Sequence, residues 1–209
     1  MSYIKKYLKR AKTAGKLLRF VPFLKMAALN GSIVRGEQTR KSDIDFLIIA
    51  RAGRLYTARF FATVLIHLTG YRRHGKKIAG RICLNCYLND KNPDITPKDK
   101  ESLLKVARAY KHLILLIDNG VSRKFFKVNK WFYKFTVAGE KYSRDLQQNY
   151  FKKFPRKPKR CFEKLLAGRF GDWVEKKLMK YQVKKILAGK SPQDEIVATV
   201  GEIRLHPRK

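Results

Sequence analysis

Short apolar runs alternate with amphipathic segments along the first half of the chain. Apolar residues recur every three or four positions between lysines from Ile4 to Leu18, which predicts a helix. Further helices are expected at 55–69 and 99–117. Strands are expected where short runs are rich in aliphatic, β-branched or aromatic residues, at 25–31, 42–50 and 80–89. This order predicts one α/β or α+β unit.

The remainder of the chain, from residue 121, is predicted to be mostly helical and basic. "KKFPRKPKR" (152–160) should be extended, because its two prolines forbid a continuous helix. A helix is expected at 161–187, followed by a closing strand or hairpin in "EIVATVGEIRLHP" (195–207). We therefore expect a first domain at 1–119 and a basic, mainly helical C-terminal region at 120–209 that packs on it.

Charge limits the partners of this chain. Its 209 residues include 49 Lys and Arg against 16 Asp and Glu, a formal net charge of +33, while 44% hydrophobic residues are enough to fill a core. Self-repulsion of this size normally needs a polyanion to offset it, and nucleic acid is the leading candidate.

The cysteines and the apolar runs bear on location. Cys83, Cys86 and Cys161 cannot form a disulfide framework, so we expect a reducing cytoplasm. Cys83 and Cys86 should face opposite ways on a strand, and no second Cys/His pair has ligand spacing, so zinc is not expected.

The apolar runs fall short of the ~20 residues that cross a bilayer, and no membrane partner is expected. We interpret the basic amphipathic N-terminus as part of the fold, not as a transit peptide.

Two aspartates open the second predicted strand. Residues two apart on a strand point to the same face, so Asp43 and Asp45 should lie side by side. Ile44 and Phe46 then point into the core. Adjacent carboxylates repel each other unless a cation neutralises them, and Mg²⁺ accepts carboxylate oxygens while leaving room for phosphate oxygens. The alternative is an Asn-Gly hairpin turn followed by a strand that carries surface acids.

A Gly-Ser pair precedes the aspartates. Gly31 would let the backbone approach a ligand, and Ser32 would begin a helix whose free N–H groups attract phosphate. We expect a triphosphate to lie between this pair and metal ions held by the aspartates, with Arg35 or Arg40 neutralising further charge. Such an arrangement suits transfer of a nucleotidyl group.

The stretch "GSIVRGEQTRKSDIDFLI" resembles the signature of the DNA polymerase beta type nucleotidyltransferase superfamily, and its minimal nucleotidyltransferases in particular. The matching residues are Gly31, Ser32, Arg35, Gly36, Ser42, Asp43 and Asp45. The resemblance implies a nucleotidyltransferase fold, a small mixed sheet flanked by helices. It implies that Asp43 and Asp45 are catalytic and hold Mg²⁺ or Mn²⁺. The residues expected to bind an NTP, which we expect to be ATP, are Gly31, Ser32, Arg35 and Ser42.

The third predicted strand departs from this pattern. Catalytically complete members usually carry a third carboxylate on a neighbouring strand, whereas the polar residue here is Asn85. We expect Asn85 to share a face with Cys83 and Tyr87 and to contact the metal or substrate, although an amide cannot act as an anionic base. Asp90 or Asp94 would supply the missing charge if either folded back. Alternatively, Asn85 is a partly exposed residue bonded to the backbone.

Basic residues of the C-terminal region are the expected contact with a nucleic-acid backbone, with an affinity that falls steeply with salt. They are Lys152, Lys153, Arg156, Lys157, Lys159 and Arg160. A second stretch, "SRKFFKVNKWFYKF" (122–135), interleaves lysines with aromatic residues. The spacing of its apolar residues predicts the buried stripe of a helix, with base stacking as the alternative. These apolar residues are Phe125, Val128, Phe132 and Phe135.

The sequence thus predicts a metal-dependent nucleotidyltransferase that moves a nucleoside monophosphate from an NTP to a hydroxyl. RNA is the expected acceptor, because a chain of charge +33 would repel polycationic aminoglycosides. Two alternatives remain open. One is a catalytically degenerate nucleotidyltransferase-fold protein that binds RNA, and the other is an enzyme of toxin–antitoxin type that AMPylates protein.

Overall fold

The computed structural model describes residues 3–75, 77–97, 99–155, 157, 160–189 and 195–206. Its first six elements follow the predicted order. They are α1 (Tyr3–Leu18), β1 (Leu24–Asn30), α2 (Ser32–Arg35), β2 (Ile44–Ala50), α3 (Leu55–Leu68) and β3 (Ile82–Asn89). The strands are apolar along most of their length because both faces of the sheet are covered by helices.

The helix predicted at 99–117 is wrong in its second half. α4 (Ser102–Tyr110) ends before His112, and β4 (Ile114–Asp118) is a strand paired antiparallel with β1. A short aliphatic run is compatible with a buried strand or a buried helix, and periodicity does not separate the two. Pairing with β1 makes the segment a strand, because it supplies hydrogen-bond partners for the buried backbone N–H and C=O groups.

The C-terminal half is mostly helical, as predicted, but in shorter pieces. Its elements are α5 (Val121–Val128), the 3-10 helix η1 (Lys130–Lys134), α6 (Glu140–Asn149), α7 (Arg160–Leu165), α8 (Arg169–Ala188), β5 (Glu195–Ala198) and β6 (Glu202–His206). The single helix expected at 161–187 is interrupted at Gly168, whose backbone is extended. The closing hairpin is confirmed, because β5 and β6 pair antiparallel.

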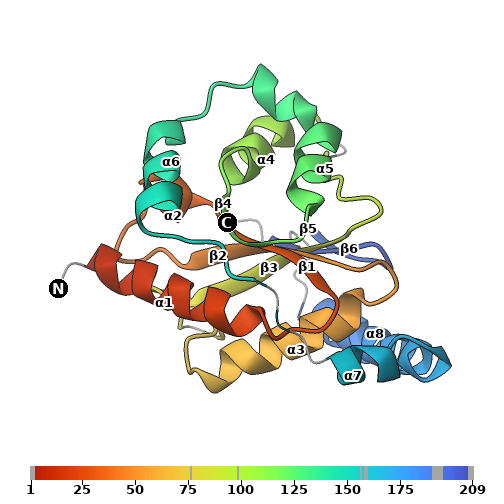
Figure 1. Ribbon diagram of the computed structural model, residues 1–209. Coiled ribbons are helices and arrows are strands. Elements are labelled where there is room, and N and C mark those ends of the chain that lie inside the picture. Colours follow the sequence, from red (N-terminus) through yellow and green to blue (C-terminus); the bar gives the residue numbers. More distant parts are fainter. Residues whose placement is uncertain are drawn as a thin grey trace.

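The six strands form one mixed sheet in the order β4-β1-β2-β3-β6-β5. β2 and β3 are parallel, and the other neighbouring pairs are antiparallel. α1 and α3 lie on one side of the sheet, with α7 and α8 beyond α3, and α4 and α5 lie on the other side (Figure 1). The predicted class, a small mixed sheet flanked by helices, is confirmed.

Each face of the sheet carries its own hydrophobic core. Alternate residues of β2 divide between them: Phe46 packs with α1 and α3, whereas Leu47 packs with α4 and α5. Phe125 and Phe132 are fully buried in the second core, so the buried stripe predicted for 122–135 is correct for these two residues. Val128 is 37% exposed, because α5 ends there and η1 follows.

The described part of the C-terminal region contacts the first 119 residues at several points. β6 pairs with β3, and the backbone N–H of Phe154 donates to the carbonyl oxygen of Leu116 at 2.6 Å. The domain division at residue 119 stays a prediction. Among the described residues, no helix combines the length and the apolar character that a membrane span requires.

Candidate functional site

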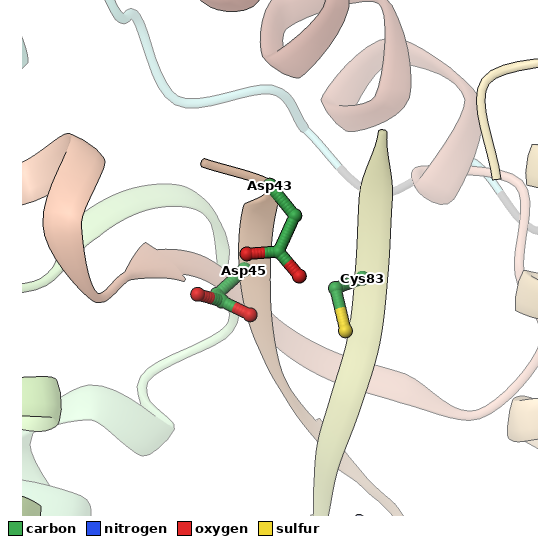
Figure 2. A group of neighbouring side chains, drawn as sticks. All are labelled: Asp43, Asp45 and Cys83. Carbon is green, nitrogen blue, oxygen red and sulfur yellow. The ribbon is translucent and has the colours of Figure 1, made fainter. Parts of the chain in front are cut away.

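Asp43 and Asp45 lie at the start of β2 and are partly buried. Asp45 is the second residue of the strand, and Asp43 immediately precedes it. One carboxylate oxygen from each aspartate and Sγ of Cys83 lie within 4.8 Å of one another. Figure 2 shows the three side chains gathered at the ends of the two strands. The spacing of the aspartates therefore produces the expected side-by-side carboxylates.

Cys83 faces the aspartates because β3 runs parallel to β2. The pairing sets Asp45 opposite Cys83. Burial raises the pKa of the Cys83 thiol, and the negative charges of Asp45 and Asp43 raise it further, while Arg73 acts in the opposite direction. The thiol is thus neutral at physiological pH unless a ligand cation displaces its proton.

A bulge in β3 places Asn85 beside Asp45. Phe46 pairs with Leu84 and the next residue of β2 pairs with Cys86, so Asn85 is an extra residue in the ladder. Its Nδ2 donates to Oδ1 of Asp45 at 2.8 Å, and its own Oδ1 is buried without a hydrogen-bond partner among the described residues. Asn85 therefore orients one aspartate and leaves an unused oxygen nearby.

The bulge overturns two sequence predictions. Tyr87 packs in the core that faces α3, so it does not share a face with Asn85. Cys86 packs in the core that faces α4 and lies on the same side as Cys83, not opposite it. The prediction assumed strict alternation along the strand, and one inserted residue inverts the alternation that follows.

Arg73 is a site residue that the sequence interpretation missed. Its Nη1 lies 2.5 Å from Oδ2 of Asp43 and 3.7 Å from Sγ of Cys83. Backbone hydrogen bonds hold the arginine there: the N–H of Arg73 donates to the carbonyl of Ile82, and the N–H of Ile82 donates to that of Tyr71. The guanidinium supplies a positive charge that offsets the repulsion between the carboxylates.

Gly31 lies against Asp45 from the other side. Its backbone has φ 75° and ψ −149°, a conformation that favours glycine. A Cβ at this position would lie 2.8 Å from Oδ2 of Asp45. The turn expected at Gly31-Ser32 therefore comes within contact distance of the predicted metal-binding carboxylate.

Two other predicted nucleotide ligands lie on or beside the short helix α2. Ser32 is its first residue, as expected. Arg35 is engaged elsewhere: its Nε donates to Glu37 at 2.8 Å and its Nη1 to the carbonyl of Arg108 at 2.7 Å. The hydrogen bond from Arg35, together with the charges of Arg35 and Arg108, lowers the pKa of Glu37. Among the described contacts, the guanidinium that reaches Asp43 is that of Arg73, not that of Arg35.

Ser42 and Arg40 lie in the turn before β2. Oγ of Ser42 accepts a hydrogen bond from the backbone N–H of Thr39 at 2.9 Å. The guanidinium of Arg40 lies 5.9 Å from the ring centre of Tyr3 on α1. Their hydrogen-bond and ring contacts therefore organise the turn that presents Asp43.

The acids after β3 do not complete the site. Asp90 follows the end of the strand opposite to Cys83, and its Oδ1 accepts from the backbone N–H of Ala52 at 2.9 Å. Oδ1 of Asp94 accepts from the N–H and hydroxyl of Thr96. The suggestion that either acid folds back to the aspartates is wrong, because Asp90 binds the loop that follows β2 and Asp94 caps its own local turn.

The basic segment at 152–160 is described only in part. Lys152, Lys153 and Lys157 are exposed, and Nζ of Lys153 lies 3.8 Å from Oδ2 of Asp118. Arg156, Lys159 and the side chain of Arg160 lie outside what the structure describes. The three lysines are available to a polyanion, and the nucleic-acid contact of the segment stays a prediction.

The donor set fits a divalent cation. Two carboxylate oxygens suit Mg²⁺ or Mn²⁺, whereas a thiolate is a softer ligand that favours ions later in the transition series. Oδ1 of Asn85, which has no hydrogen-bond partner in the described part of the chain, is a further oxygen beside Asp45. Within the described ranges, no other three His, Cys, Asp or Glu side chains are close enough to hold a metal ion.

A comparison with protein families matches this part of the chain. A family model described as "Nucleotidyltransferase domain" matches residues 5–116, which include β1, α2, β2 and β3. The match agrees with the resemblance in the segment that contains Gly31, Asp43 and Asp45. No curated protein and no solved structure gave a significant match.

Proposed function

Since the chain belongs to the nucleotidyltransferase domain family, we propose that it transfers a nucleoside monophosphate from an NTP to a hydroxyl group of RNA. One observation carries this proposal: the carboxylates of Asp43 and Asp45 converge with Cys83 within 4.8 Å, beside the bend at Gly31. In the reaction, the acceptor hydroxyl loses its proton to water and its oxygen bonds to the α-phosphorus. The bond from that phosphorus to the oxygen that bridges the α- and β-phosphates breaks, and pyrophosphate leaves.

Each residue of the site has a part in this proposal. Asp43 and Asp45 would hold Mg²⁺ or Mn²⁺, and Asn85 would keep Asp45 in its orientation through the 2.8 Å hydrogen bond. When bound, the metal neutralises phosphate charge and orients the α-phosphate. Gly31 and Ser32 would receive the triphosphate. Because Gly31 has no side chain, the backbone there lies close to Asp45 and leaves room for the phosphates. Ser42 would support this end of β2, and Arg35 would bind nucleotide only after leaving Glu37.

RNA as acceptor, ATP as donor and the cytoplasm as location belong to the same proposal. The charge of +33 supports a polyanionic acceptor, and Lys152, Lys153 and Lys157 offer exposed cations for its backbone. The sparse cysteines, all three of them free, suit a reducing compartment.

A second candidate function is RNA binding without catalysis. It is favoured by the contact between Arg73 and Asp43, since the guanidinium is bonded to a carboxylate oxygen that a metal ion would need. Cys83 and Asn85 stand on the strand where complete relatives carry a carboxylate, and neither is an anionic base at neutral pH. A degenerate site of this kind would leave the basic surface as the functional part.

Label incorporation separates these candidates. The full chain is incubated with each α-³²P-labelled NTP, Mg²⁺ or Mn²⁺, and either total RNA or total protein. We expect label in RNA, with ATP as the donor, and loss of this label in Asp45→Asn. Asp145→Asn removes the same charge from the exposed face of α6 and should retain activity.

The other outcomes assign the chain differently. Label in protein instead of RNA would identify an AMPylating enzyme. Salt-sensitive RNA binding without incorporation, unchanged in Asp45→Asn, would identify the degenerate RNA-binding protein and reject the transferase.

A further inference from the structure

Polar contacts fix which side of α8 faces the protein. Both carboxylate oxygens of Glu175 accept from backbone N–H groups at the start of α3, those of Tyr56 and Thr57, at 2.8 Å. Seven residues further on, Nε2 of Gln182 donates to the carbonyl of Tyr56 at 3.0 Å. These contacts anchor α8 on α3, on the side of the sheet opposite α4 and α5 (Figure 1). The opposite side of α8 is therefore the outward one.

Aromatic rings form a stripe on the outward side. Phe170, Trp173 and Tyr181 are 53%, 57% and 61% exposed. At 3.6 residues per turn their positions fall on one side of the helix, away from Glu175 and Gln182. The rings of Phe170 and Trp173 are nearly parallel, with an interplanar angle of 24° and centroids 6.0 Å apart. Rings that serve a core are buried, so this stripe is not explained by the folding of the chain.

Lysines lie between and beside these rings. Nζ of Lys177 is 5.8 Å from the ring centre of Trp173, and Nζ of Lys185 is 5.8 Å from that of Tyr181. A surface hollow of about 630 Å³ follows the same helix. The residues that line it include Trp173, Lys176, Lys177, Lys180 and Lys184. Met179 and Val183 line it as well, so its walls combine apolar side chains and an indole with four lysine side chains.

The outward side of α8 carries no compensating acid. The two acids of this helix are Asp172, which pairs with Arg54 at 2.6 Å, and Glu175, which contacts the start of α3. Among the residues of α8, the exposed stripe therefore combines flat aromatic faces with lysines and no acid. This combination matches a ligand that alternates flat rings with anions.

We propose that this surface, defined as Phe170, Trp173, Lys177, Lys180, Tyr181 and Lys184, binds single-stranded nucleic acid. Bases stack on the three rings, and the lysines contact the phosphates. A lipid bilayer fits less well, because Lys177 lies between Trp173 and Tyr181 on the same stripe. Insertion of both rings to the level of the acyl chains would carry that ammonium with them. Leu47, two residues after Asp45 on β2, packs with α4 and α5, whereas α8 lies on the opposite side of the sheet (Figure 1). Asp45 shares the face of Leu47, so the surface on α8 is separate from the candidate site.

Fluorescence anisotropy of labelled 20-nucleotide oligomers tests the surface. The full chain is used without NTP or metal, so the result does not depend on nucleotidyl transfer. We expect Trp173→Ala and Tyr181→Ala each to weaken binding about tenfold. Trp173→Phe, which keeps a ring, should retain most of the affinity and shows that the position tolerates substitution. Tyr133→Ala removes an equally exposed ring from η1 and should bind like the wild type.

The salt dependence tests the lysines. Replacing Lys177, Lys180 and Lys184 together by Gln should reduce the slope of log affinity against log salt by about two. The same change at three exposed lysines on the other side of the sheet serves as the matched control and should have a smaller effect. These control positions are Lys105, Lys127 and Lys130.

Three results would overturn the proposal. Wild-type affinity in both Trp173→Ala and Tyr181→Ala would exclude stacking on this stripe. Equal losses in Tyr133→Ala would show that binding is not localised to α8. Binding to phosphatidylcholine–phosphatidylglycerol vesicles that depends on Trp173, while oligomer binding does not, would identify a membrane surface instead.

Discussion

Nη1 of Arg73 lies 2.5 Å from Oδ2 of Asp43, which places a guanidinium where the paired carboxylates need a cation. The arginine also reaches Cys83, so it contacts two of the three side chains that converge at the start of β2 and β3. The chain thus neutralises its own carboxylates with a tethered charge. A divalent metal and Arg73 would compete for the same oxygens.

We predict that Arg73→Met increases the affinity of the chain for Mn²⁺. The pair is partly exposed, with side-chain exposures of 31% for Arg73 and 17% for Asp43, so its contribution is limited to about 1 kcal/mol. Removing the competitor should therefore tighten Mn²⁺ binding roughly fivefold. Isothermal titration calorimetry at fixed ionic strength measures the change.

Arg51→Met is the matched control for Arg73→Met. Arg51 is exposed and follows the far end of β2, so this variant lowers the net charge equally without touching the site. Unchanged or weaker Mn²⁺ binding in Arg73→Met would show that the arginine supports the carboxylates instead of competing for them.

We predict that Gly31→Ala displaces Asp45. The new Cβ would lie 2.8 Å from Oδ2 of Asp45, and the backbone at Gly31 has φ 75°. The strain should cost about 1 kcal/mol of stability, and Mn²⁺ binding should weaken at least tenfold. Gly53→Ala is a close control, since Gly53 has the same φ but nothing within 4 Å of its Cβ position. If the two variants bind Mn²⁺ equally, Gly31 does not position Asp45.

The order of elements up to β3 could be predicted because each segment has one dominant period. α1 shows helical spacing over 16 residues, and β2 is a short apolar run after a turn. β4 could not be predicted in this way. Its five residues are equally compatible with the end of a helix. Pairing with β1, which lies almost ninety positions earlier in the sequence, makes them a strand.

In the candidate site too, features set by local spacing could be predicted, whereas features set by strand pairing could not. The side-by-side placement of Asp43 and Asp45 follows from local geometry and could be predicted from their spacing. The positions of Cys83, Asn85 and Arg73 depend on the register between β2 and β3 and on a bulge, which no local pattern encodes. The closely spaced glycines at 70, 75 and 80 are a sequence signal for turns on either side of residues 71–73, and all three have positive φ in the structure.

We predict an alkaline loss of stability that depends on Cys86. Burial raises the pKa of this thiol to about 12, with the hydrogen bond to Tyr110 acting in the opposite direction. The unfolded thiol ionises near pH 9, so the stabilisation is complete below that pH and is lost as the pH rises toward the folded pKa. The wild type should therefore lose roughly 2 kcal/mol relative to Cys86→Ala between pH 8 and pH 10.5.

Urea denaturation at the two pH values measures this difference. Cys86→Ser has a hydroxyl that does not ionise in this range, so it should differ from Cys86→Ala in stability at pH 8 but share its pH dependence. If the free energy of unfolding changes between the two pH values by the same amount in the wild type and in both variants, the thiol has the same pKa in the folded and unfolded chains.

The last prediction concerns the choice of metal. A thiolate favours softer ions, whereas Mg²⁺ prefers oxygen. Cys83→Asp would complete a set of three carboxylates around the 4.8 Å cluster and should strengthen Mg²⁺ binding about tenfold. The change is made in the Cys161→Ser background of the Cd²⁺ test below, where exposed Cys161 would bind the soft ion by itself. Calorimetry with Mg²⁺ gives the affinity.

Cd²⁺ supplies the complementary test of Cys83. Bound to the Cys161→Ser protein, it should give the near-ultraviolet absorption of a thiolate–metal bond, and Cys83→Ser should abolish this band. Cys86 is fully buried in the core beside Tyr110 and should not contribute. A band that persists in Cys83→Ser would place the metal away from the aspartates. Mg²⁺ affinity that is unchanged in Cys83→Asp would show that the side chain at position 83 does not face the metal, because a carboxylate that faces Mg²⁺ would coordinate it and raise the affinity.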